Sequence, residues 1–219
     1  MPRRAVLITG AARGIGRAIA EDLAQDHDVA ITWLTAEAEA ATFAARHPGA
    51  LALPFDAGTD DPAALIAAVL AHFGRLDGLV NNAGRVHPTD LAAFDPRPAA
   101  ELMQVNALSP LALIAAALPH LGPGASVVNI TSLNARTPPA GAIAYAASKA
   151  ALEAITIGCA KALGPRGIRV NAVSPGAVER AHAPRPPDLI ARFVAEAALG
   201  RLALDSEIAA ATRFLLSDA

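Results

Sequence analysis

The chain has 219 residues, of which 53% are hydrophobic and 17% charged, and its formal net charge is −2. This length suits one α/β domain spanning residues 1–219, and the composition excludes a disordered or fibrous chain. The charge balance, with no basic block, gives no sign of nucleic acid binding. The single cysteine, Cys159, excludes an internal disulfide and is interpreted as an inert thiol.

The longest apolar runs, residues 63–71 and 111–118, are too short to span a bilayer. The N-terminus is basic, but Thr9 and Gly10 interrupt the apolar run that follows, so we expect no signal peptide. We therefore expect a cytoplasmic protein that does not contact a membrane.

Residues 5–8 are an apolar run bounded by glycine, which is typical of a buried parallel strand. A turn with three glycines follows and leads into a segment of helical period: Thr9-Gly10-Ala11-Ala12-Arg13-Gly14-Ile15-Gly16. A strand, a glycine-rich turn and a helix in this order aim backbone N–H groups at a phosphate. Gly10 allows the tight turn, Gly14 the approach of a pyrophosphate, and Gly16 close packing of helix on strand. Such a triplet is often only a turn, but its place after the first strand favours a phosphate site.

Strands and helices alternate along the remaining chain. We expect further strands at residues 29–33, 50–55, 76–80, 125–130 and 168–173. Helices are expected at 36–46, from Pro62 with Asp61 as N-cap, at 99–118 and 143–163, and near 188–199 and 206–217. Pro110 should kink its helix or tighten the turn. This alternation, without a repeat or linker, predicts one doubly wound parallel α/β sheet with helices on both faces.

The segment 143–163 is long, rich in alanine and free of proline, and it carries Tyr145 and Lys149. Because the two residues are four apart, the phenol and the ammonium lie on one helix face, where the cation favours the phenolate. The pair is therefore a candidate proton donor and acceptor. The same spacing is common on helix surfaces, but this helix has few other charged residues.

Other polar and glycine-containing motifs fall at the carboxyl ends of the predicted strands, where open α/β sheets bind ligands. They are the glycine-rich turn, Asp56, Asn81-Asn82-Ala83-Gly84, Ser132 and Pro175-Gly176. Together with Asn106 and the Tyr145-x-x-x-Lys149 pair, they resemble the short-chain dehydrogenase/reductase family in their order along residues 5–218. Each motif alone could have a purely structural role, as a turn, a hydroxyl at a strand end or a hydrogen-bonded helix residue. Their joint occurrence in the family's order argues against a purely structural interpretation.

The resemblance implies a Rossmann-type fold and a set of roles. Tyr145 would be the general acid in carbonyl reduction, Lys149 would lower its pKa and hold the nicotinamide ribose, and Ser132 would hydrogen-bond the substrate oxygen. Asn106 would hold a water in the proton relay behind Lys149. No metal is implied. The implied cofactor-binding residues are Thr9, Gly10, Arg13, Gly14, Ile15, Gly16, Asp56, Asn82, Ala83, Gly84, Tyr145, Lys149, Pro175 and Gly176.

The end of the second predicted strand bears on the choice of nicotinamide cofactor. A site selective for NAD presents a carboxylate there, whereas this chain has no acid before Glu37. Arg13 stands where reductive members of the family place a cation for the 2′-phosphate, and the Thr35 hydroxyl could add a hydrogen bond. We therefore expect NADP (NADPH) rather than NAD. The alternative is that Arg13 is a solvated turn residue.

Two features depart from the family's pattern. The family carries a threonine shortly after Pro175-Gly176 that contacts the nicotinamide carboxamide, and this chain has Arg180 at the matching position. The chain also ends at Ala219, where relatives continue into a seventh strand, so we expect that strand to be missing. His87 and His182 lie in loops that could border the substrate, although a solvated histidine is the favoured interpretation.

The leading hypothesis is an NADP-dependent oxidoreductase that reduces a ketone or related carbonyl compound to an alcohol. Within this class, 3-oxoacyl thioester and pteridine reduction both remain open, because loops 85–98 and 177–190 would decide the substrate. Two other classes also remain open. One is a non-catalytic module that senses NADP, and the other is a subunit that scaffolds a partner.

Helices 99–118 and 143–163 are apolar on both faces, and such helices need a second surface to pack against. On helix 143–163 a seam of small side chains faces away from Tyr145: Ala147, Ala151, Ala154 and Gly158. On the other helix, the residues expected to face away from Asn106 are Ala107, Leu108, Leu111 and Ala115. The resemblance implies that both helices pair with their copies across a two-fold axis. We therefore expect a homodimer, with the tetramer weakened by the missing strand.

Overall fold

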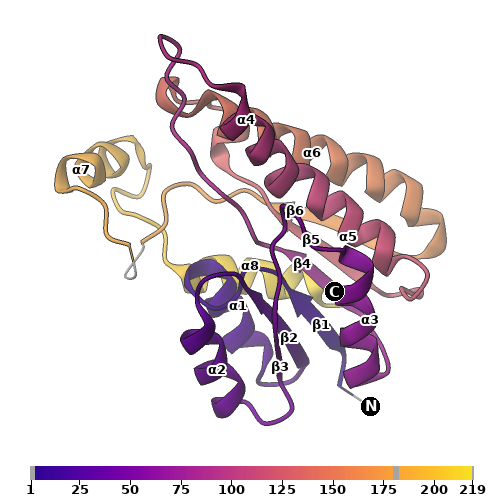
Figure 1. Ribbon diagram of the computed structural model, residues 1–219. Helices are drawn as coiled ribbons and strands as arrows, with labels where there is room; N and C mark the ends of the chain where they lie inside the picture. Colours follow the sequence, from indigo (N-terminus) through magenta and orange to yellow (C-terminus); the bar gives the residue numbers. More distant parts are fainter. Residues whose placement is uncertain (1–2, 180–182, 219) are drawn as a thin grey trace.

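The structure is a computed structural model in which residues 3–179 and 183–218 are described. These residues form a six-stranded parallel sheet in the order β3-β2-β1-β4-β5-β6 (Figure 1). The strands are β1 Ala5–Ile8, β2 Asp28–Trp33, β3 Leu51–Pro54, β4 Gly78–Asn81, β5 Ser126–Ile130 and β6 Arg169–Val173. The strand order reverses between β1 and β4, which confirms the expected doubly wound Rossmann-type sheet.

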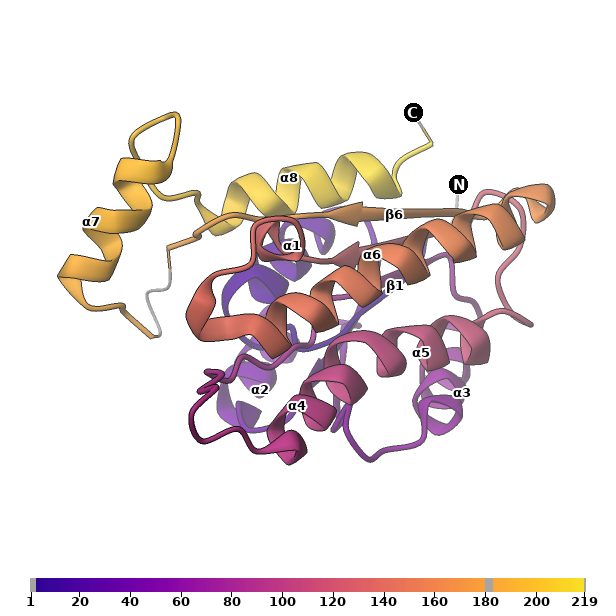
Figure 2. The same ribbon diagram turned by 90° about the horizontal axis from the view of Figure 1, so that it is seen from above.

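Helices cover both faces of the sheet (Figures 1 and 2). One face carries α1 Gly14–Leu23, α2 Glu37–Arg46 and α8 Asp205–Leu216. The other face carries α3 Pro62–Phe73, α4 Pro96–Met103, α5 Ser109–Ala117 and α6 Ile143–Leu163. Successive strand residues therefore enter different cores: Leu7 packs beneath α3, α5 and α6, and Ile8 beneath α1, α2 and α8. Helix α7, Pro187–Glu196, stands apart from both layers, and none of its residues is fully buried.

Helix α3 begins and ends where its sequence signals indicate. Asp61 Oδ1 accepts a hydrogen bond from the N–H of Ala63 at 2.9 Å, and Pro62 is the first helical residue. Gly74 ends the helix in a left-handed conformation with φ 71°. Helix α6 likewise has the predicted bounds, 143–163.

The helix that carries Asn106 starts earlier than predicted and is interrupted. It begins at Pro96 rather than at residue 99, because Asp95 Oδ1 accepts the N–H of Arg97 at 2.9 Å and caps the helix. A π-helical segment, Gln104–Leu108, separates α4 from α5. The apolar pattern indicated one continuous helix and does not reveal this wide turn.

The turn before Pro110 is widened instead of tightened. Ser109 donates its N–H to the carbonyl of Gln104, five residues back, as in a π-helix. Pro110 itself has no N–H to offer the carbonyl of Asn106. The wide turn also redirects side chains. Our expectation that Ala107 faces outward is wrong, because Ala107 is fully buried.

Two helical stretches, Pro96–Ala117 and Ala140–Arg166, are long and apolar enough to cross a membrane by length and composition. Uninterrupted apolar runs alone do not reveal this property. In the fold both stretches pack against the sheet layer and against each other (Figure 2), and core helices of globular domains meet the same criterion. The cytoplasmic location stays a prediction.

Candidate active site

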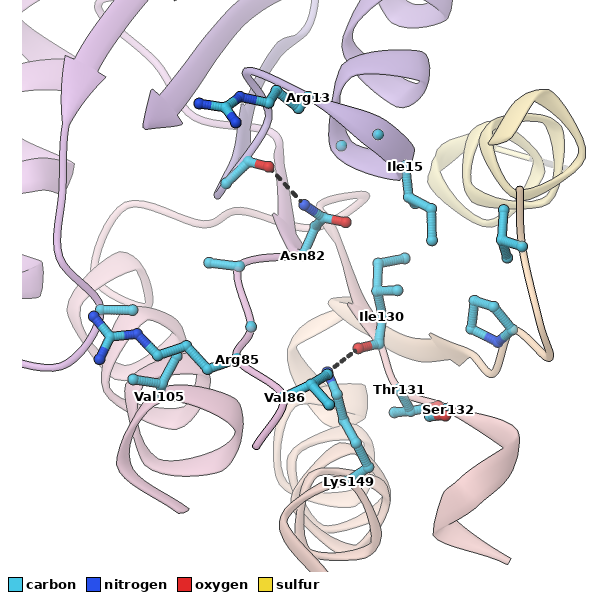
Figure 3. A pocket seen from close by; sticks show the side chains of 18 of the residues that line it. Arg13, Ile15, Asn82, Arg85, Val86, Val105, Ile130, Thr131, Ser132 and Lys149 are labelled. Carbon is cyan, nitrogen blue, oxygen red and sulfur yellow. Dashed lines mark hydrogen bonds between the residues drawn. The ribbon is translucent and has the colours of Figure 1, made fainter. Parts of the chain in front are cut away.

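A cavity of about 400 Å³ opens at the carboxyl ends of the strands, where the strand order reverses. Figure 3 shows this cavity with side chains from the glycine-rich turn, the strand ends and α6 around it. The predicted site residues that line it are Gly10, Arg13, Gly14, Ile15, Gly16, Asp56, Asn82, Ala83, Gly84, Ser132, Tyr145, Lys149, Pro175 and Gly176. Thr9 and Asn106 are buried and do not line the cavity.

The glycine-rich turn presents the start of α1 to the cavity. Gly14, the first residue of α1, has φ 56°, a left-handed conformation that glycine adopts without strain. No side chain caps the start of α1, and no acidic residue lies in its first turn. The N–H groups there can therefore meet an anion. A β-carbon on Gly16 would clash with the Asn82 side chain, so this glycine permits contact with the loop after β4.

Asn82 and Thr9 hold the glycine-rich turn against the loop after β4. Asn82 Nδ2 donates to the carbonyls of Thr9 at 2.9 Å and Gly10 at 3.0 Å, as Figure 3 shows in part. Thr9 Oγ1 accepts the N–H groups of Asn82 at 3.1 Å and Ala83 at 3.0 Å. The Thr9 hydroxyl is thus used inside the protein, and its role here is to join two loops.

Tyr145 and Lys149 both line the cavity from α6. Lys149 is buried, and its Nζ donates to the Ile130 carbonyl at 2.8 Å (Figure 3). Burial removes water from the ammonium and lowers the pKa of Lys149 from 10.5 to about 8. Lys149 is therefore mostly charged at neutral pH and loses its charge at mildly alkaline pH.

Ser132 follows β5 and lines the cavity. Its Oγ accepts the N–H of Asn134 at 3.2 Å, which starts the short 3₁₀ helix Leu133–Ala135. Because that bond uses only a lone pair, the hydroxyl proton of Ser132 can be donated to another oxygen.

Asn106 is fully buried in the π-helical segment, and its side chain is committed to protein groups. Its Oδ1 accepts the N–H of Arg85 at 2.8 Å, and its Nδ2 donates to the Arg85 carbonyl and to Ser148 Oγ, both at 2.9 Å. Ser148 Oγ donates in turn to the Tyr145 carbonyl at 2.7 Å. The Asn106 carbonyl lacks the N–H of Pro110 and can accept a hydrogen bond from water.

Three charged residues that line the cavity were missed by sequence reasoning: Arg85, Arg185 and Asp205. The Arg85 guanidinium pairs with Glu101 and lies 3.5 Å from Asp56 Oδ2. Its position directly after Asn81-Asn82-Ala83-Gly84 was the available signal. Arg185 and Asp205 lie in no motif, so only the folded chain reveals them.

The Arg13 side chain pairs with an acidic residue that lies beyond the end of β2, where the sequence was searched for a carboxylate. Arg13 Nε lies 3.0 Å from Glu39 Oε1, and the two side chains are 39% and 48% exposed. Glu39 comes from the first turn of α2, whereas Thr35 is exposed just before that helix. A carboxylate therefore approaches the position expected for the 2′-phosphate.

The remaining candidates contribute less. His87 is exposed, its Nδ1 lies 2.8 Å from the Pro88 carbonyl oxygen, and it does not line the cavity. Arg180 and His182 lie outside the described residues. Cys159 is half-buried, and burial raises the pKa of its thiol. Within residues 3–179 and 183–218, no three His, Cys, Asp or Glu side chains gather as metal ligands.

The fold and the site define a dinucleotide-binding α/β protein. A family model described as enoyl-(acyl carrier protein) reductase matches residues 10–219. The chain is also 40% identical over 183 residues to the short-chain dehydrogenase/reductase FrzI of Cladobotryum sp, a match that covers 80% of this chain and 71% of FrzI.

Solved structures of short-chain dehydrogenases/reductases are similar to this chain along most of its length. A double mutant of a Serratia marcescens short-chain dehydrogenase/reductase has a TM-score of 0.93 and 33% identity, covering 98% of this chain and 91% of that one. A Burkholderia cenocepacia short chain dehydrogenase in complex with NADP has a TM-score of 0.87 and 36% identity, covering 98% and 90%. The chain belongs to the short-chain dehydrogenase/reductase family and is an NAD(P)-dependent oxidoreductase acting on CH–OH or C=O groups.

Proposed function

We propose that the protein is an NADP-dependent reductase that converts a ketone or related carbonyl compound into an alcohol. The observation that carries this proposal is that Tyr145, Lys149 and Ser132 line the same cavity as the glycine-rich turn. A dinucleotide and a small carbonyl compound can therefore lie side by side in it. The residues fit a dinucleotide: the uncapped start of α1 with Gly14 lies at the cavity, and a β-carbon on Gly84 would crowd Asn106 Oδ1 at 3.1 Å, so glycine suits this position beside Lys149.

The nicotinamide, when bound, supplies a hydride to the carbonyl carbon. Negative charge then develops on the substrate oxygen, and the Ser132 hydroxyl would donate a hydrogen bond to it. The Tyr145 phenol would give its proton to the same oxygen and complete the alcohol. The Lys149 ammonium favours the phenolate that remains and would hold the nicotinamide ribose. A water bound to the Asn106 carbonyl would pass a proton back through Lys149.

The proposal is tested by screening the purified protein for NADPH oxidation with ketones, 3-oxoacyl thioesters and pterins. We expect turnover with at least one of these carbonyl or pterin classes, and the class that reacts will identify the substrate more narrowly. A protein that binds NADPH and oxidises it with none of them would be a sensor module. A protein that binds neither NADPH nor NADH would favour the scaffolding role.

We infer that NADP is preferred over NAD. The pair between Arg13 and Glu39 is exposed, and such pairs are worth about 1 kcal/mol or less. A phosphate offers a guanidinium two parallel charge-assisted hydrogen bonds, so Arg13 can exchange Glu39 for the 2′-phosphate. The NADP complex of the Burkholderia cenocepacia relative supports this inference.

Arg13→Ala is therefore expected to weaken NADPH binding by about tenfold or more and NADH binding by less than about threefold. Fluorescence titration with both cofactors measures the two dissociation constants. Arg46→Ala is the matched control, because Arg46 is an exposed arginine that pairs with Glu21, and neither residue lines the cavity. Equal losses for NADPH and NADH would show that Arg13 supports the turn and not the phosphate.

We also propose that the protein is a homodimer through α4–α5 and α6. The small residues Ala147, Ala154 and Gly158 are exposed along α6, with Ile157 58% exposed among them. On the neighbouring helix, the outward residues Leu108, Leu111 and Ala115 are exposed as expected. Exposed small and apolar side chains on both helices favour close packing with a second copy across a two-fold axis.

Ala154→Arg should dissociate this dimer, because it forces a large charged side chain into a seam of small residues. Light scattering should give a dimer mass for the wild type and a monomer mass for the variant. Ala38→Arg, on an exposed position of α2 across the sheet, is the matched control and should remain dimeric. A monomeric wild type or a fully dimeric Ala154→Arg variant would contradict the proposed interface.

A further inference from the structure

Ser148 lies fully buried on α6, between Tyr145 and Lys149. Its Oγ accepts a hydrogen bond from Asn106 Nδ2 at 2.9 Å and donates one to the Tyr145 carbonyl at 2.7 Å. A hydroxyl has a single proton, so these two bonds fix its direction. A continuous chain of hydrogen bonds thus runs from the Asn106 side chain through Ser148 to the backbone of Tyr145.

Building on the proposed function, we propose that Ser148 is a positioning residue of the active site. Its hydroxyl fixes the π-helical segment that carries Asn106 against the turn of α6 that carries Tyr145. The other hydrogen bonds of the Asn106 side chain reach the backbone of Arg85, directly after the cavity residue Gly84. Ser148 therefore links the loop on the cofactor side of the cavity to the helix with the proton donor.

Loss of the Ser148 hydroxyl should disturb the hydrogen bonds of the Asn106 side chain. One Nδ2 proton of Asn106 would be left without a partner in a fully buried place, and the segment would have to shift to satisfy it. The π-helical turn resists such a shift weakly, because Pro110 offers no N–H to the Asn106 carbonyl. A displacement of about 1 Å at a catalytic group can lower a rate about 10²-fold.

Thr156, two turns further along α6, provides a matched control. Its Oγ1 accepts from Asn129 Nδ2 at 2.8 Å and donates to the Leu152 carbonyl at 2.7 Å. This pattern repeats that of Ser148: a buried hydroxyl joins an asparagine amide of another segment to a carbonyl of its own helix. Thr156, Asn129 and Leu152 do not line the cavity.

The experiment compares Ser148→Ala with Thr156→Ala, and we expect both variants to lose stability to a similar degree. Only Ser148→Ala should lower kcat for carbonyl reduction, by about tenfold or more, with the KM for NADPH within about threefold of the wild type. Ser148→Cys, which fills the site with a weakly hydrogen-bonding group, should behave like Ser148→Ala. Equal kcat values for the two alanine variants, or wild-type kcat in Ser148→Cys, would overturn the proposal.

A second readout does not depend on turnover. Hydrogen exchange of the Asn106 side-chain amide, followed by NMR, should become faster in Ser148→Ala and stay unchanged in Thr156→Ala. If the wild type reduces no carbonyl compound, the proposed function fails, and faster exchange still supports the tether between Ser148 and Asn106. Unchanged exchange in Ser148→Ala overturns the tether.

Discussion

Tyr145→Phe is expected to lower kcat for carbonyl reduction by roughly 10²–10⁴-fold, the usual contribution of a positioned proton donor. The substitution removes only the phenolic oxygen and keeps the ring that lines the cavity. Affinity for NADPH should therefore stay within about threefold of the wild type, because the cofactor keeps its other partners. Steady-state kinetics and a fluorescence titration of NADPH measure the two quantities separately.

Ser132→Ala serves as a companion variant for this test. It removes a hydrogen bond to the substrate oxygen and leaves the proton donor in place, so its loss of kcat should be smaller than that of Tyr145→Phe. Wild-type turnover by Tyr145→Phe on a compound that the enzyme reduces would show that another group donates the proton.

Lys149→Ala should damage both turnover and cofactor binding. It removes a buried cation and leaves the Ile130 carbonyl without the hydrogen bond at 2.8 Å. We expect a loss of kcat of about 10²-fold or more and a rise of about tenfold in the dissociation constant of NADPH. Lys161→Ala, an exposed position on the same helix, is the matched control and should change neither quantity. Loss of turnover with unchanged NADPH affinity would contradict the role of Lys149 in holding the cofactor.

The pH dependence of stability tests the burial of Lys149 independently. Burial lowers the folded-state pKa from 10.5 to about 8, so the unfolded chain binds more protons between these two values. Stability should therefore rise with pH through this window, as the penalty for burying the charge fades. Relative to Lys149→Met, the free energy of unfolding of the wild type should rise by up to about 3 kcal/mol across this window. If the free energy of unfolding differs between the two proteins by the same amount at pH 8 and at pH 10.5, this account is contradicted.

Much of the fold follows from local signals. Short apolar runs bounded by glycine or polar residues become the parallel strands, and Asp61 with Pro62 starts α3 as predicted. The π-helical segment was not predictable, because apolar periodicity carries no information on whether Ser109 bonds four or five residues back. The same turn explains the misplaced Ala107, which lies inside the π-helical segment, where the wider turn changes the direction of the side chains.

The candidate site was predictable where it is built from strand ends, because parallel strands deliver their carboxyl ends to one edge of the sheet. This rule gathers Gly10, Asn82, Ser132 and Gly176 without knowledge of any contact. Contacts between side chains were not predictable. The pairing of Arg13 with Glu39 depends on how α2 packs in the folded chain, and a sequence pattern cannot predict that packing.

The central claim is that this cavity transfers a hydride from NADPH to a carbonyl carbon. The most direct measurement uses NADPH deuterated at the transferable position of the nicotinamide, with mass spectrometry of the alcohol formed from a ketone or thioester that the screen identifies. We predict an alcohol that carries deuterium on the carbon of the former carbonyl group, and far less of this labelled alcohol when Tyr145→Phe replaces the wild type. An alcohol formed without deuterium on that carbon would contradict the account.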